Sequence, residues 1–175
     1  SEKEEVLREA REEAKDIERR LERLLERDKE VIDRVEKDLE RLLRENKKLI
    51  DDVRRRVEEE GPDERLKKEL RDSLRESAER VKDLLRRLEE HLRRTAEELR
   101  KLAEDLRESI KRLRERIGDD EVMDEIRRLA ERVERRLREV LERSKKLVDD
   151  LRERLKEVLK RIEDLYRRLE EEADR

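Results

Sequence analysis

Apolar residues repeat every 18 positions in each third of this chain. In the first third the matching columns are Leu7, Leu25 and Leu43; Ile17, Val35 and Val53; and Leu21, Leu39 and Val57. In the later thirds they are Leu66, Leu84 and Leu102; Leu70, Leu88 and Leu106; Val122, Val140 and Val158; and Leu129, Leu147 and Leu165. Eighteen residues complete five turns of a straight α-helix, whereas a seven-residue repeat would impose a left-handed supercoil. The pattern therefore predicts long, straight helices packed side by side.

Two turns interrupt the apolar pattern, and they carry signals for helix ends. Glycine suits the position after a helix, proline stops a helix, and aspartate caps the next one. A serine followed three positions later by glutamate forms a capping box at the start of the chain. The residues that carry these signals are Ser1, Gly61, Pro62, Asp63, Gly118, Asp119 and Asp120. They predict helices over 2–60, 64–117 and 120–173, with turns at 61–63 and 118–119.

The short turns and the width of the apolar stripe predict how these helices are arranged. Connections of two or three residues place consecutive helices antiparallel. Over residues 21–38 the inward positions form one apolar seam with a few apolar residues beside it. A stripe of this width can pack against two neighbouring helices. We therefore predict an all-α fold, a single-chain, antiparallel, up-down-up three-helix bundle with little or no supercoil, in one domain over residues 1–175.

Composition changes this picture mainly by excluding partners. Charged residues make up 62% of the chain, but the apolar residues lie on stripes, which argues against a disordered polyampholyte. Both signs of charge are mixed and the formal net charge is -3, so we expect no nucleic-acid partner. The chain has no cysteine, and no apolar run approaches the roughly 20 residues that span a bilayer. We expect a soluble monomer, cytoplasmic in an expression host, without partner, cofactor or metal.

The chain resembles the parametrically designed de novo helical bundles, above all the untwisted three-helix designs built on an 18-residue repeat. The resemblance covers the whole chain and rests on the repeat, the Gly-Asp and Gly-Pro-Asp turns, the lack of Phe, Trp and Cys, and the Glu/Arg/Lys surface. Spectrin-type three-helix repeats are the natural competitor, but they are shorter, carry core tryptophan and supercoil on heptads. The resemblance implies a hyperstable structural scaffold with no enzymatic activity.

Polar residues occupy some positions of the apolar stripes. Counted from the two turns, Asp28 lies level with Thr95, and His91 lies one turn away. The third helix adds Ser144 at the same level. We predict that these four residues form a buried hydrogen-bond network. Such a network contributes little stability but penalises slipped registers, because a slip leaves polar groups unpaired in the core.

A second polar level lies nearer the first turn. Asn46 is level with Ser77, and Ser73 lies one turn away. We predict a second network of these three residues, with Tyr166 within about a turn of it. Ser109 is level only with alanines, so we expect its hydroxyl to bond the backbone of its own helix.

The central level also admits other interpretations. Asp, His and Ser or Thr are the residue types of a hydrolase triad, but a triad also needs a cleft and free oxyanion donors, and mid-helix N–H groups are already bonded. One His and one Asp make an incomplete metal shell. A binder needs exposed aromatic anchors, and the one aromatic residue lies on a core column. We therefore predict no catalytic, cofactor-binding or metal site. The alternatives are a designed bundle with a hydrolase-like or pH-responsive Asp-His-Ser/Thr site, and a designed protein binder.

Overall fold

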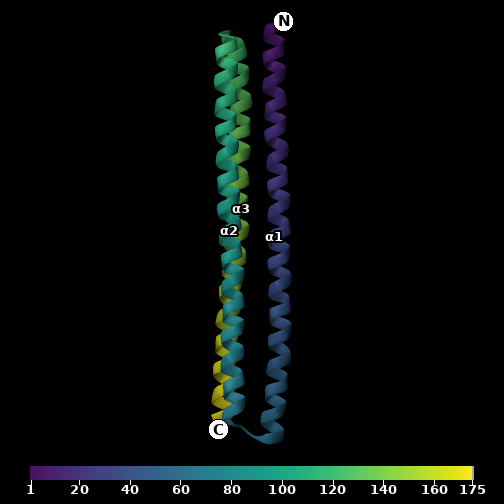
Figure 1. Ribbon diagram of the computed structural model, residues 1–175, viewed down its shortest axis with the longest axis vertical. Coiled ribbons are helices and arrows are strands. Elements are labelled where there is room, and N and C mark those ends of the chain that lie inside the picture. The colour runs from purple at the N-terminus through teal and green to yellow at the C-terminus, as the bar shows by residue number, and fades with distance from the viewer. Residues whose placement is uncertain (175) are drawn as a thin grey trace. The chain divides into compact units, whose positions relative to one another are not determined.

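Three α-helices make up the computed structural model, which describes residues 1–174 and the side chains of residues 1–172. Helix α1 spans Glu2–Glu60, α2 spans Glu64–Arg116 and α3 spans Asp120–Asp174 (Figure 1). Residues 1–174 contain no strand, so the predicted all-α, three-helix fold is confirmed. Helix α2 ends one residue earlier than expected, which lengthens the second turn to residues 117–119.

Contacts divide the chain into two compact units, and each unit contains parts of all three helices. The first unit consists of Ser1–Glu30 and Glu90–Leu147, and the second consists of Val31–Glu89 and Val148–Arg175. The single domain expected from the sequence therefore stays a prediction.

In the first unit, side chains from the three helix segments share one core. Ile17 and Leu21 of α1 pack in one apolar cluster with Leu102 of α2 and Val133 of α3. A second apolar cluster, around the start of α1, contains Val6 of α1, Leu113 of α2 and Ile126 of α3, among others. Removing such side chains from water is the main stabilising contribution in a bundle whose surface is almost entirely charged.

In the second unit, the same columns of the 18-residue repeat supply the core. Val35, Leu39 and Val53 of α1 are buried. The buried residues of the other two helices include Leu66, Leu70, Leu84 and Leu88 of α2 and Val148, Leu155 and Ile162 of α3. The column that ends in Leu43 differs, because this leucine is 42% exposed at the flank of its stripe. The repeat therefore predicted which columns are apolar, but central and flanking columns differ in burial.

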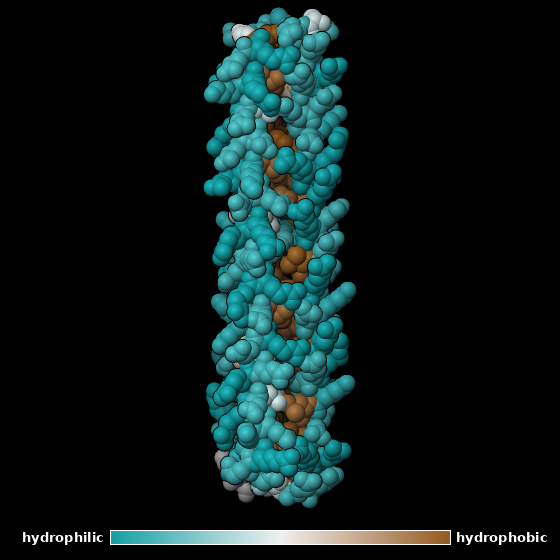
Figure 2. Space-filling model, in the orientation of Figure 1, coloured by the Kyte–Doolittle hydropathy of each residue, from teal (hydrophilic) through white to brown (hydrophobic). Residues whose placement is uncertain are grey.

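Figure 2 shows a face covered mainly by hydrophilic residues, with hydrophobic ones confined to small areas between them. The large hydrophobic side chains classed as exposed in the described structure are Leu43 and Leu147, at 42% and 37%. No helix of the described chain combines the length and apolar character needed to cross a membrane.

Candidate functional site

The buried carboxylate of Asp28 is the centre of a polar cluster in the first unit. Asp28 lies on the inward face of α1 and is only 2% exposed. Its Oδ1 lies 2.5 Å from Nε2 of His91 on α2. Its Oδ2 accepts a hydrogen bond from the hydroxyl of Ser144 on α3. One carboxylate thus bonds a side chain from each of the other two helices, and both of its oxygens have partners.

The order of these groups decides what chemistry they can perform. In a hydrolase triad the histidine lies between the carboxylate and the hydroxyl, so that it can take the hydroxyl proton. Here Asp28 lies between His91 and Ser144, and the serine hydroxyl donates to the carboxylate instead. This arrangement does not create a histidine-activated nucleophile.

Thr95 does not join this cluster, contrary to expectation. Its side chain is buried at 3% exposure, but no hydrogen bond between its hydroxyl and Asp28, His91 or Ser144 occurs among residues 1–172. The carboxylate instead bonds the imidazole of His91, whose side chain is longer and reaches further, and the hydroxyl of Ser144. Thr95 is a buried helix residue at the right level, but it has no role in the Asp28 cluster.

Asn46 is the centre of a second buried polar cluster, in the second unit. Its Oδ1 accepts hydrogen bonds from the hydroxyl of Ser77 at 3.1 Å and from the phenol of Tyr166 at 2.9 Å. Its Nδ2 donates to the backbone carbonyl of Leu42 at 2.8 Å. Ser77 lies on α2 and Tyr166 on α3, so this side chain also links all three helices.

Ser73 was expected in this cluster, and the structure places it outside. Ser73 is half-buried and lines a shallow surface groove, with no hydrogen bond to Asn46 among the described side chains. Tyr166 takes the place assigned to Ser73, because the phenol reaches the amide from a position about a turn away. A signal was present in the sequence: a tyrosine on a core column needs a partner for its hydroxyl.

Burial changes the acidity of Tyr166. The side chain is 1% exposed, and removal from water disfavours the phenolate. This desolvation, together with the nearby charge of Glu76, raises the pKa of Tyr166 to about 12. The phenol therefore stays a hydrogen-bond donor to Asn46 over the whole neutral range.

Ser109 corrects a further expectation. Its hydroxyl was expected to bond the backbone of its own helix, but it accepts a hydrogen bond from the guanidinium of Arg112 at 3.2 Å. Arg112 lies three residues further along α2 and extends over the serine. A long surface side chain thus satisfies a hydroxyl at the edge of the core.

Side-chain caps begin all three helices. The Ser1 hydroxyl accepts from the N–H of Glu4 at 3.4 Å, and Asp63 Oδ1 accepts from the N–H of Leu66 at 2.7 Å. Asp119 Oδ1 accepts from the N–H of Val122 at 3.1 Å, so Asp119 is the cap and Asp120 begins α3. A hydrogen bond from Lys3, followed by that from the backbone, lowers the pKa of Asp119.

The two glycines end their helices differently. Gly61 has a φ of 79° and donates its N–H to the carbonyl of Val57 at 3.0 Å, as expected for a residue directly after a helix. Gly118 was expected to act in the same way, but it does not adopt a positive φ. Their positions explain the difference. Gly61 directly follows α1, whereas Ile117 is the residue that follows α2, donating its N–H to the carbonyl of Leu113 at 3.2 Å.

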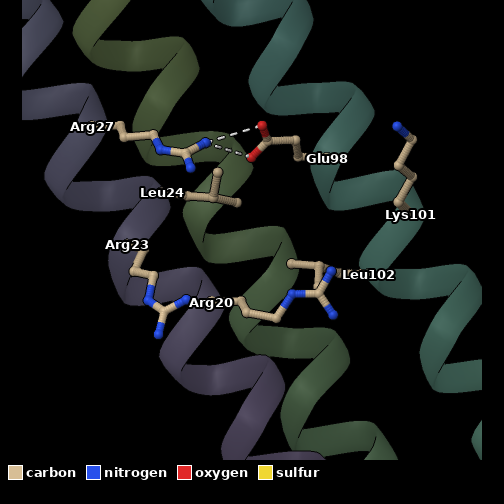
Figure 3. A pocket seen from close by; sticks show the side chains of 7 residues that line it. All are labelled: Arg20, Arg23, Leu24, Arg27, Glu98, Lys101 and Leu102. Carbon is tan, nitrogen blue, oxygen red and sulfur yellow. Dashed lines mark hydrogen bonds and ion pairs between the residues drawn. The ribbon is translucent and has the colours of Figure 1, made fainter.

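A charged groove lies between α1 and α2 in the first unit (Figure 3). Leu24 and Leu102 line it together with cationic side chains, and Arg27 bonds both oxygens of Glu98, at 3.1 and 3.2 Å. Arg20 pairs with Asp105 at 3.3 Å at the same interface. Among the described residues, no group of three His, Cys, Asp or Glu side chains is placed to hold a metal ion.

Among known proteins, similarity is found to solved structures. No protein-family model matches this chain, and no curated protein matches it. A solved structure described as "Computationally designed three helix bundle" is similar at 18% sequence identity, over 99% of this chain and 86% of that one, with a TM-score of 0.42.

Proposed function

We propose that this chain is a de novo designed structural scaffold, whose role is to hold three helices in one defined register and which has no natural biochemical activity. The observation that carries the proposal is the position of Asp28 between His91 and Ser144, with one residue from each helix at a single level of an apolar core. The 18-residue repeat and the absence of Phe, Trp and Cys support a designed origin.

The proposed role of the two polar clusters is to penalise misaligned packing. With near-identical repeats, apolar residues would match almost as well after a shift of one helix by 18 positions. Asp28 and Asn46 are 18 residues apart, so a shift of α1 by one repeat would place one of them among the other's partners. It would still leave the second set of partners in the core without their hydrogen-bond acceptor. Breaking a buried pair costs about 3–5 kcal/mol, although the intact pair contributes little to stability.

Stability measurements on matched variants test this role. Asp28→Leu alone should cost about 3–5 kcal/mol, because His91 and Ser144 lose their common partner. Replacing all three together by apolar residues should be neutral or stabilising, because no unpaired polar group remains. Thr95→Val is the matched control at a buried position and should cost much less than Asp28→Leu, since its hydroxyl bonds none of the three. Urea titrations at raised temperature give the free energies of unfolding, and an Asp28→Leu variant as stable as the parent would refute the proposal.

A hydrolase-like function is the alternative that the residue types in the Asp28 cluster allow. Hydrolysis of an activated ester tests it, with Ser144→Ala and His91→Gln compared to the parent. We expect a rate no faster than exposed side chains give, unchanged in both variants. A saturable rate that either substitution abolishes would replace the scaffold proposal with a designed esterase.

A further inference from the structure

Three helices with these apolar stripes can pack in two ways. In either unit the α3 segment can lie on one side or the other of the α1–α2 pair, and the same core columns meet in both arrangements. The two arrangements differ in which flank of each helix faces which neighbour. In the other arrangement, the flank of α1 that now faces α2 would face α3. We propose that the charged flanking residues select which of these two arrangements forms.

On the flank that α1 turns toward α2, charged residues of α1 form ion pairs with α2 in both units. Glu2–Arg116 and Glu13–Arg112 are two of these pairs. The other six are Glu9–Arg116, Arg20–Asp105 and Arg27–Glu98 in the first unit, and Asp38–Arg87, Glu45–Arg80 and Arg56–Glu69 in the second, and these six follow the repeat. Along α1 these residues are spaced by 11 and 7 positions alternately, which together make the 18-residue repeat. The sign of the α1 residue changes from each repeat to the next.

The opposite flanks of α1 and α2 face α3. On α1, Arg11 pairs with Glu125 at 2.6 Å, and Glu36 pairs with Arg154 at 3.3 Å. The corresponding pairs from α2 are Arg71–Glu170 at 3.6 Å and Glu89–Arg152 at 3.7 Å. These flanks would face each other across the α1–α2 groove in the other arrangement.

That exchange would bring like charges together. The register between α1 and α2 is constant, because a step of seven residues from Asp38 to Glu45 is matched by a step back of seven on α2. In this register Glu36 is level with Glu89, and two further pairs of like charge would form, Arg54 with Arg71 and Arg11 with Arg114. One pair of opposite charge, Glu18 with Arg107, would offset them only in part.

Single surface ion pairs contribute little, so the selection depends on several pairs acting in the same direction. The inference goes beyond the scaffold role, which does not depend on which arrangement forms. It explains why the flanking charges are patterned in blocks of alternating sign: apolar stripes alone do not distinguish the two arrangements.

Composition-matched charge exchanges test the inference. The four-site variant Arg20→Glu, Arg27→Glu, Asp38→Arg and Glu45→Arg keeps the net charge but places like charges across the native groove. The eight-site variant also exchanges the four α2 partners, which restores every pair with inverted sign. A nitroxide on Lys101→Cys reports the arrangement, because Lys101 lines the α1–α2 groove and the chain has no cysteine.

In the parent protein we expect the label to broaden amide signals of α1 near Arg23 more than those of α3. The four-site variant should show a second set of signals, of comparable intensity, in which the amides of α3 are broadened instead. The eight-site variant should again show one set of signals, with α1 broadened. Parent protein refolded in about 1 M salt, where the Debye length is about 3 Å, should also show the second set. A single set with α1 broadened in the four-site variant, or in the salt-refolded parent, would overturn the proposal.

Discussion

At the scale of single residues, the buried phenol of Tyr166 makes stability depend on pH above neutrality. Its pKa in the folded protein is raised to about 12 from the ordinary 10.0. A raised folded pKa means that the stabilisation is complete below the unfolded pKa and is lost as pH rises through the folded pKa. We predict that the free energy of unfolding falls between about pH 10 and pH 12, by an amount on the order of 2–3 kcal/mol.

Urea titrations across this pH range measure the effect, and phenolate absorbance gives the pKa directly, because the chain has one tyrosine. Tyr166→Phe is the matched control: it should lose about 1 kcal/mol through the missing hydrogen bond to Asn46 and show no loss specific to this residue at alkaline pH. Lysine titration is common to both proteins and cancels in the comparison. A phenolate that titrates near pH 10 in the folded parent would show that the side chain is hydrated.

Counting residues from the turns could predict the levels of the polar residues but not their hydrogen bonds. Asp28 and Thr95 are level by count, yet the bond goes to His91, one turn away, because a ring reaches further than a short hydroxyl side chain. Likewise Tyr166 reaches Asn46, and Ser73 at the groove does not. The height of a residue along its helix follows from the constant rise per residue, so it can be counted from the sequence. How far its side chain reaches, and in which direction, depends on the rotamer, which packing determines.

At the scale of elements, we predict that replacing each of the two glycines by alanine changes the free energy of unfolding in different ways. Gly61 has a positive φ and a Cβ there would contact nothing within 4 Å, so Gly61→Ala should cost about 1–2 kcal/mol through backbone strain alone. Gly118 lies in ordinary backbone with open space around it, so Gly118→Ala should be neutral or stabilise by up to about 1 kcal/mol through the unfolded chain. Denaturant midpoints of the two variants measure the difference, and equal losses at both positions would contradict it.

Helix ends were predictable where a side chain makes the cap and less so where the backbone does. Asp63 and Asp119 accept hydrogen bonds from N–H groups three residues later, as their identity and position indicated. The equivalence of Gly61 and Gly118 was wrong, because a glycine permits a positive φ without requiring it. Gly61 directly follows α1, whereas Ile117 separates Gly118 from the end of α2.

At the scale of the whole molecule, long helices with capped starts and idealised apolar columns predict extreme heat resistance. The described helices have 59, 53 and 55 residues, and a side chain caps the start of each. We predict that helicity persists to about 90 °C or above in a thermal melt followed by circular dichroism. A cooperative transition below about 70 °C, within reach of ordinary mesophilic domains, would contradict this.

The distribution of apolar surface predicts that the chain is a monomer. Apolar columns are used inside each unit, and the large hydrophobic side chains classed as exposed in the described structure are two leucines, Leu43 and Leu147. Isolated side chains of this kind are common on monomers, whereas stable interfaces bury at least about 1,000 Å². Light scattering over a wide concentration range should therefore give the monomer mass of 21.7 kDa throughout. If the parent instead forms dimers and the double variant Leu43→Glu, Leu147→Glu abolishes them, these leucines belong to an interface and the monomer prediction is wrong.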